Sequence, residues 1–208
     1  ARPGANRPWR PGGWTGGSPG QFEQQCKYLA SRGMVAITAD YRVASRHNVK
    51  AISCVADAKS AIRFVRKNAA ELGIDPDRIA AGGGSAGGHL AACTGVIDGL
   101  DEAGEDTSIS SVPNALILFN PALVLAPVEG VGEVAPAKKN RADFSDRMGT
   151  DPVKLSPFHH VQQGAPPTII FHGKTDSTVP YASAEAFARA MERAGNLCTL
   201  AGYEGQAH

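Results

Sequence analysis

Short apolar runs alternate with helix-like segments along this chain, and that alternation constrains the fold more than any other feature of the sequence. The runs that we interpret as strands are MVAITADY (34–41), RIAAG (78–82), NALILFN (114–120), PTIIFHG (167–173) and LCTLAGYEG (197–205). Apolar strands that alternate with helices are typical of a parallel sheet covered on both faces. A chain of 208 residues with 42% hydrophobic content suits one core. We therefore predict a single α/β domain over residues 1–208.

The segments between these runs carry helix signals. Ser18 with Gln21 three residues on forms a capping-box pattern, at the start of a helix that ends at Gly33. The clearest amphipathic stripe runs from Val55 to Leu72, and Arg63 falls off that stripe. Two further helices are predicted over residues 85–100 and from Ala184 to Gly195. Between residues 121 and 161 the periodicity fails, and so long an irregular stretch predicts a lid or substrate loop.

The charge balance restricts the class of partner. Twenty-one basic and 20 acidic residues leave a net charge of +1, so there is no broad field to hold nucleic acid or an anionic membrane. No apolar run approaches the roughly 18 residues needed to cross a bilayer. The first residues, ARPGANRPW, lack the apolar segment of a signal peptide. We expect a soluble chain that acts on a small molecule. A cytoplasmic and a secreted location both stay open, because a signal could precede residue 1.

The cysteine pattern argues against a zinc site. Cys26, Cys54, Cys93 and Cys198 are scattered without CxxC spacing, which leaves free thiols or a disulfide as alternatives. Adjacent His159 and His160 have no carboxylate or cysteine at ligand spacing. The sequence therefore implies no metal.

The stretch GGGSAGGHL (82–90) fits two motifs. Gly82, Gly84 and Gly87 satisfy GxGxxG, but a dinucleotide site also needs an acidic residue at the end of the following strand, and the acidic residues at 101–106 precede that strand. The same stretch satisfies GxSxG around Ser85, in which a strand-to-helix turn exposes a nucleophilic serine. The helix start then directs the Ala86 backbone N–H toward an oxyanion. This context favours the nucleophile.

A serine nucleophile needs a base, and the base needs an orienting acid. In α/β folds of this kind the chain order is Ser, acid, His. His208 is the only histidine after HGKTDSTVP (172–180), and Asp176 lies just past a strand, at the carboxyl end where parallel sheets place their sites. We therefore predict Ser85, Asp176 and His208 as a triad. His89, four residues after Ser85, precedes the acid and is predicted to be structural.

Across nearly its whole length the chain resembles the α/β-hydrolase esterases related to hormone-sensitive lipase, and more closely the bacterial acetyl and feruloyl esterases that act on plant polysaccharides. The resemblance is carried by PGGWTGGSPGQF (11–22), ADYR (39–42), residues 57–92, LSPFHHV (155–161), PPTIIFHGKTDSTVP (166–180) and YEGQAH (203–208). It implies an α/β-hydrolase fold, a mostly parallel sheet with helices on both faces. It assigns Ser85 as nucleophile, Asp176 as acid and His208 as base. It also assigns the oxyanion donors to the N–H groups of Gly12, Gly13 and Ala86.

The chain departs from that family pattern at two places. Arg10 and Pro11 stand where the family has His-Gly, and ANRPWRP (5–11) replaces an apolar central strand, in which prolines remove ladder hydrogen bonds. The family's first strands and its closing helix after the base are missing, so we expect a fragment.

The resulting hypothesis is a serine carboxylesterase that forms an acyl-enzyme on short-chain esters, such as acetyl or feruloyl esters of plant polysaccharides, without any cofactor. The acetyl preference rests on the resemblance alone. Trp14 is predicted to line an acyl or alcohol pocket. The alternatives are a catalytically impaired hydrolase-fold fragment or binding module, and a prolyl-oligopeptidase-type peptidase. The oligomeric state stays open.

Overall fold

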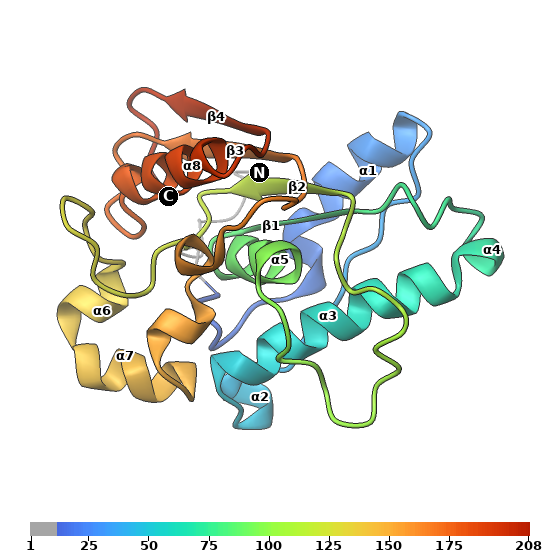
Figure 1. Cartoon of the computed structure of the whole chain (residues 1–208), viewed down its shortest axis with the longest axis horizontal. Coiled ribbons are helices and arrows are strands. Elements are labelled where there is room, and N and C mark those ends of the chain that lie inside the picture. Colours follow the sequence, from blue (N-terminus) through green and yellow to red (C-terminus); the bar gives the residue numbers. More distant parts are fainter. Residues whose placement is uncertain (1–11) are drawn as a thin grey trace, which may run out of the picture.

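The computed structural model describes residues 12–208 (Figure 1). The ANRPWRP segment, for which we predicted no central strand, lies outside the described residues, as do Arg10 and Pro11.

Four parallel strands form the sheet, in the spatial order β1-β2-β3-β4. They are β1 (Ala80–Gly84), β2 (Ala115–Phe119), β3 (Thr168–Gly173) and β4 (Cys198–Tyr203). The register pairs Gly83 with Leu118 and Leu118 with Ile170, so the carboxyl ends of β1, β2 and β3 lie side by side. These strands confirm four of the five apolar runs, with ends shifted by one or two residues.

The fifth predicted strand, MVAITADY (34–41), is wrong. Residues 34–41 have no ladder partner among residues 12–208, and Met34, Val35 and Ile37 are each more than half exposed. An apolar run becomes a buried strand only where a neighbour pairs with its backbone and covers its side chains. In the described part of the chain neither condition is met here.

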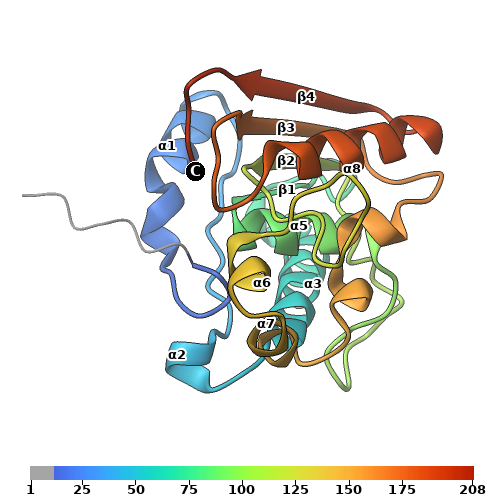
Figure 2. The same cartoon turned by 90° about the vertical axis from the view of Figure 1, so that its left-hand side faces the viewer.

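Helices cover both faces of the sheet (Figures 1 and 2). Their bounds are η1 (Pro19–Phe22), α1 (Glu23–Ser31), α2 (Ala44–His47), α3 (Ala51–Lys67), α4 (Ala69–Leu72), α5 (Ala86–Val96), α6 (Ala135–Lys139), α7 (Arg141–Met148), η2 (Pro152–Leu155), η3 (Pro157–His160) and α8 (Tyr181–Arg193). Side chains alternate across a strand, so Leu118 and Phe119 face opposite sides. Leu118 belongs to the core with α5 and α8, whereas Phe119 contacts Phe22 of η1 at a ring distance of 5.8 Å.

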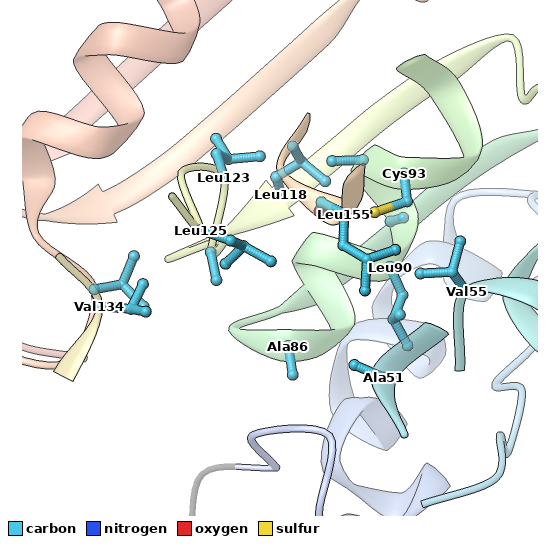
Figure 3. Packing of buried hydrophobic residues seen from close by; sticks show 14 of the residues in the cluster. Ala51, Val55, Ala86, Leu90, Cys93, Leu118, Leu123, Leu125, Val134 and Leu155 are labelled. Carbon is cyan, nitrogen blue, oxygen red and sulfur yellow. Dashed lines mark hydrogen bonds between the residues drawn. The ribbon is translucent and has the colours of Figure 1, made fainter. Parts of the chain in front are cut away.

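The main core lies between the sheet, α5, α3 and the segment that follows β2. Figure 3 shows Leu90 and Cys93 of α5 beside Val55 of α3 and Leu155 of η2. The sequence of α5 has no exposed polar stripe, and nine of its 11 residues are buried, His89 and Thr94 among them. A helix without a polar face is one that is enclosed by its neighbours. Helix α5 is therefore a central, enclosed support on which the turn at Ser85 is built.

Arg63, which falls off the apolar stripe of α3, is nevertheless buried. Its guanidinium pairs with Asp101 at 2.6 Å and Glu105 at 3.1 Å. Lys59, one turn earlier, is also buried and donates to Ile97 O. A buried charge is tolerated when it is paired and hydrogen-bonded. The inner face of α3 is thus partly ionic, and it anchors the loop after α5.

Residues 121–161 are more ordered than the failed periodicity predicts. The segment contains α6, α7, η2 and η3, and it buries Leu123, Phe144, Met148 and Leu155. These helices are four to eight residues long, too short for a stripe of several turns to show in the sequence. The proposed lid or substrate role of this segment stays a prediction.

All four cysteines are free thiols, and Cys54 and Cys93 are buried. Burial raises the pKa of the Cys93 thiol well above its ordinary value, which keeps it protonated and unreactive. None of the helices in residues 12–208 has the length and apolar character required to span a bilayer.

Candidate active site

Ser85 lies on a sharp turn between β1 and α5. Its backbone has φ 53° and ψ −119°, a conformation that a residue with a Cβ adopts only under strain. The turn is held by the Ser85 N–H, which donates to Phe119 O at 2.9 Å. A Cβ on Gly83 would lie 2.6 Å from the carbonyl carbon of Gly87, so this glycine is required for the strand and helix to pass so closely. The glycines around Ser85 therefore serve a backbone turn.

The structure brings Ser85, His208 and Asp176 together. His208 Nε2 lies 2.8 Å from Ser85 Oγ, and His208 Nδ1 lies 2.7 Å from Asp176 Oδ2. The three residues follow β1, β3 and β4, whose carboxyl ends share one edge of the sheet (Figure 2). A neutral His208 that donates its Nδ1–H to Asp176 presents the Nε2 lone pair to the serine hydroxyl.

Asp176 is held as a carboxylate by several donors. Its side chain is buried; Oδ1 accepts from the N–H groups of Thr178 at 2.8 Å and Val179 at 2.9 Å. Burial by itself would raise the pKa of Asp176, but hydrogen bonds from His172, His208, the Val179 N–H and Asn120 outweigh it and hold the pKa well below its ordinary 3.8. The carboxylate stays charged at neutral pH, ready to stabilise a positive His208.

Two residues that the sequence interpretation did not assign to the site contact Asp176, although His172 was expected to support its strand end. Asn120, just after β2, donates its Nδ2–H to Asp176 Oδ2 at 2.7 Å and to Ala207 O at 3.4 Å. His172 is fully buried; its Nε2 donates to Val179 O at 2.9 Å and lies 3.4 Å from Asp176 Oδ2. In the sequence, only their positions at strand ends distinguish Asn120 and His172 from other polar residues. In the structure, Asn120 also has a φ of 44°. Both restrict where the carboxylate can point.

The loop that carries His208 packs directly against Gly173 at the end of β3. A Cβ at Gly173 would lie 2.3 Å from Gln206 O and 2.5 Å from Ala207 O. Thr175 fixes the same loop, because its N–H and its hydroxyl both donate to Gln206 O, at 3.0 Å and 2.7 Å. The position of the imidazole therefore depends on a glycine 35 residues away in the chain.

We expect Gly173→Ala to lower kcat by about 100-fold, because the added methyl must push the 206–207 backbone away and with it the His208 imidazole, and misplacement of about 1 Å can cost that much. Steady-state hydrolysis of p-nitrophenyl acetate measures the change. Gly164→Ala is the control, since nothing lies within 4 Å of a Cβ there, although its positive φ makes it a strained substitution too. Equal losses in the two variants would contradict the packing argument.

The turn that contains the predicted oxyanion donors is a tight one. Gly12 O accepts from Thr15 N at 2.7 Å and Gly16 N at 2.9 Å, and Gly13 and Trp14 have φ values of 47° and 62°. The third predicted donor, the Ala86 N–H, belongs to the first residue of α5, where helical N–H groups lack partners within the helix. Trp14 is 3% exposed and lies in the core; its role as a pocket wall stays a prediction.

His89 is buried one helical turn after Ser85. Its Nδ1 accepts from the Trp14 indole Nε1–H at 3.0 Å, and its Nε2–H donates to Leu155 O at 2.7 Å. Burial lowers the pKa of His89 from 6.5 to about 4, against a smaller opposing effect of the Leu155 hydrogen bond. His89 is therefore neutral at physiological pH. Both of its ring nitrogens are engaged away from the triad, as those of a structural histidine should be.

This buried histidine predicts a pH dependence of stability. The unfolded chain binds a proton at position 89 below about pH 6.5, whereas the folded chain does so only below about pH 4, so the free energy of unfolding should fall by about 3 kcal/mol as the pH decreases through that window. Urea unfolding between pH 7.5 and 4.5 measures the slope. His89→Asn, which removes the titrating group, should flatten it; an unchanged slope would contradict the assignment.

Residues 12–208 hold no group of three or more His, Cys, Asp or Glu side chains placed to bind a metal ion together. His159 Nδ1 is bonded to Ser156 Oγ at 2.8 Å, and His160 Nε2 to Val153 O at 3.0 Å. Each of the two histidines thus has a local partner in its own segment.

A parallel sheet with a serine on the turn between a strand and a central helix, in contact with a histidine and an aspartate at the same sheet edge, defines the α/β-hydrolase fold. Comparisons with known proteins agree. The BD-FAE family model matches residues 10–191, and the chain belongs to the BD-FAE family.

The relatives are ester hydrolases. Structures of Thermogutta terrifontis esterase 2 are 56% identical in the form phosphonylated by sarin (TM-score 0.89, 95% of this chain and 71% of that chain) and 57% identical in the butyrate-bound form (TM-score 0.86, 95% and 70%). A probable isoprenylcysteine alpha-carbonyl methylesterase of rice, Oryza sativa subsp. japonica, is 32% identical over 95% of this chain and 48% of its own length. The chain spans about half the length of the curated relatives it matches, or less.

Proposed function

We propose that this protein is a serine carboxylesterase that hydrolyses short-chain acyl esters through an acyl-enzyme. The observation that carries the proposal is the continuous hydrogen-bonded path from Ser85 Oγ through the His208 imidazole to the Asp176 carboxylate, with heavy-atom distances of 2.8 Å and 2.7 Å. Such distances are within the range in which a base can take the proton of a nucleophile.

In the first half-reaction, Ser85 Oγ attacks the ester carbonyl carbon while its proton passes to His208 Nε2. The carbonyl electron pair moves to oxygen, and we assign its stabilisation to the N–H groups of Gly12, Gly13 and Ala86. The tetrahedral intermediate then collapses: the bond to the alcohol oxygen breaks, and that oxygen takes the proton from His208. The products of this step are the free alcohol and an ester of Ser85.

In the second half-reaction, water takes the place of the alcohol. His208 accepts a proton from the water as its oxygen attacks the acyl carbon, and the second tetrahedral intermediate releases the carboxylic acid as the proton returns to Ser85 Oγ. Asp176 keeps its charge throughout: it holds the imidazole in the productive tautomer and stabilises the imidazolium. These steps use only side chains and backbone groups of the chain.

The narrower proposal is a preference for short acyl groups such as acetyl, with feruloyl esters of plant polysaccharides as a related substrate class. The butyrate-bound and propionate-bound structures are of T. terrifontis esterase 2, and they support a short acyl group here by similarity only. We assign the wall of the acyl or alcohol pocket to Trp14 and the lid to residues 121–161.

Two measurements test the proposal. A fluorophosphonate probe should label the protein at one equivalent, and the mass increase should map to the peptide that contains Ser85; absence of labelling in folded protein would favour an impaired hydrolase-fold protein instead. A series of p-nitrophenyl esters should give the highest kcat/KM at acetate or butyrate. Faster turnover of the octanoate ester would refute the short-chain preference while leaving the serine mechanism intact.

A further inference from the structure

The triad does not use the most deeply enclosed polar side chain of α5. His89 has no exposed surface, and it lies four residues after Ser85, on the same face of the same helix. Both of its ring nitrogens have partners from other parts of the chain: Trp14 in the turn before η1, and Leu155 in η2. One imidazole thus joins the helix behind the nucleophile to two separate segments.

The partner on the Nδ1 side belongs to the turn assigned to the oxyanion. Trp14 is a large residue with a φ of 62°, next to Gly13 with a φ of 47°. A left-handed conformation costs a residue with a Cβ about 1–2 kcal/mol, so tertiary contacts must hold this turn in place. The indole supplies such contacts, because its N–H donates to His89 at 3.0 Å and its ring meets the imidazole edge-on at a centroid distance of 5.1 Å.

The protonation state of His89 makes this bond directional. A neutral imidazole has one donor and one acceptor nitrogen, and the Leu155 carbonyl oxygen can only accept. The proton must therefore be on Nε2, which leaves Nδ1 as the acceptor that the indole N–H requires. The two side chains recorded against the ring, Trp14 and Cys93, are uncharged, and Cys93 Sγ lies 3.3 Å from Nε2.

We propose that Trp14 and His89 form a buried clamp that positions the oxyanion donors Gly12 and Gly13 relative to Ser85, with His89 fixed on the nucleophile helix and the indole N–H as the connecting bond. The inference rests on the proposed function, since it concerns donors to an oxyanion that forms only during ester hydrolysis. In the clamp both residues are positioning residues that act through Gly12, Gly13 and Ser85; the pocket wall proposed above concerns the aromatic ring of residue 14, which Trp14→Phe retains.

The clamp should affect the chemical step more than substrate binding. Oxyanion contacts strengthen in the transition state, so a misplaced donor lowers kcat and leaves KM nearly unchanged. Loss of a whole donor costs about 100- to 1,000-fold in kcat. Loosening a turn that keeps its donors should cost less, about 10- to 100-fold.

Four substitutions test separately the hydrogen bonds at the two nitrogens of the His89 imidazole. Trp14→Phe keeps an aromatic ring but removes the N–H. His89→Asn places an acceptor oxygen near the Nδ1 position, and His89→Gln places a donor near the Nε2 position. Cys93, one turn further along α5 and fully buried, lies near Nε2 and the Leu155 carbonyl and not at the indole bond, so Cys93→Ala serves as the control for general loosening of the helix.

We expect Trp14→Phe and His89→Gln to lower kcat for p-nitrophenyl acetate by about 10- to 100-fold, with KM changed by less than about threefold. His89→Asn should retain kcat within about fivefold, Cys93→Ala should retain it fully, and the Trp14→Phe/His89→Gln double variant should lose no more than the worse single variant. Inhibition by a trifluoromethyl ketone, which forms an oxyanion on Ser85, should weaken with kcat, while inhibition by acetate should not.

The opposite pattern would overturn the clamp. Full kcat in Trp14→Phe, or retention by His89→Gln with loss in His89→Asn, would show that the bond to the indole does not matter. A loss of kcat that follows the thermal stability of all four variants, Cys93→Ala included, would assign the pair to folding alone. Ser85→Ala distinguishes the two levels: if it is inactive and the wild type is active, the esterase proposal stands whatever the clamp variants do.

Discussion

Replacing Ser85 with alanine is expected to lower kcat for p-nitrophenyl acetate by about 10⁴-fold or more. The substitution removes the only atom of the triad that bonds to the acyl carbon, so no acyl-enzyme can form and His208 can at best assist direct attack by water. The rest of the site stays in place, because the turn is held by the backbone bond from Ser85 N to Phe119 O and by the close approach at Gly83. Steady-state rates with purified protein, and loss of fluorophosphonate labelling, measure the effect.

A matched serine provides the control for this variant. Ser183 is fully buried at the start of α8, where its hydroxyl donates to Pro180 O at 2.7 Å. Ser183→Ala should lose some stability, about 1 kcal/mol for a hydrogen bond of this kind, and keep full activity. Activity of Ser85→Ala within about tenfold of the wild type, with the protein folded by circular dichroism, would refute the nucleophile assignment.

Asp176→Asn should have the second largest effect, a fall in kcat of about 10³- to 10⁴-fold. The Asn side chain can still accept from the Thr178 and Val179 N–H groups through Oδ1, but its Nδ2 would then lie where the carboxylate oxygen now accepts from His208 and Asn120. To accept from that amide, His208 must move its proton to Nε2. An imidazole in that tautomer cannot take the proton of Ser85.

The loss in Asp176→Asn should appear in the pH dependence of kcat, while the variant keeps its folded structure. Asp57→Asn is the control: it makes the same chemical change in a partly buried carboxylate that accepts from Arg42 N at 2.7 Å, away from the triad. It should lower thermal stability and keep kcat within about threefold. If Asp57→Asn and Asp176→Asn lowered kcat equally, the acid assigned to His208 would be wrong.

The parts of the fold that could be predicted are those with local signals. The runs that became β1 to β4 are apolar and bounded by turn residues, and the helix that became α8 shows a regular stripe, so pattern alone located them to within three residues. The contact among Ser85, Asp176 and His208 could also be predicted from the sequence. Chain order and the shared carboxyl edge of a parallel sheet leave few other candidates for the acid and the base.

The failures come from properties that a single segment does not contain. Residues 34–41 are as apolar as the true strands, but a strand needs a neighbour, and none in the described chain pairs with it. Arg63 is a charged residue off the apolar stripe, and only its partners Asp101 and Glu105, about 40 residues further on, explain its burial. Composition therefore predicts burial poorly where the compensating group is remote in sequence.

The residues that support the site could not be predicted from the sequence either, because their partners are also remote in sequence. Asn120 is an ordinary polar residue after a strand until its amide is seen against Asp176, and Gly173 is one of 24 glycines until the Gln206 carbonyl is seen against it. His89 was assigned a structural role from chain order, and its hydrogen bonds to Trp14 and Leu155 are consistent with that. Its contact with the turn to which we assign the oxyanion donors is visible only once distant segments are packed together.

The positions of Ser85, Asp176 and His208 along the chain also bear on how the proposed site forms during folding. Ser85 and His208 are 123 residues apart in the chain, with β2, β3 and β4 between them in sequence, yet Ser85 Oγ and His208 Nε2 lie 2.8 Å apart. Contacts so distant in sequence are slow to form, because the intervening chain must first be ordered. Secondary structure should recover before ester hydrolysis on dilution from denaturant, and during synthesis the triad can assemble only once residue 208 has been made.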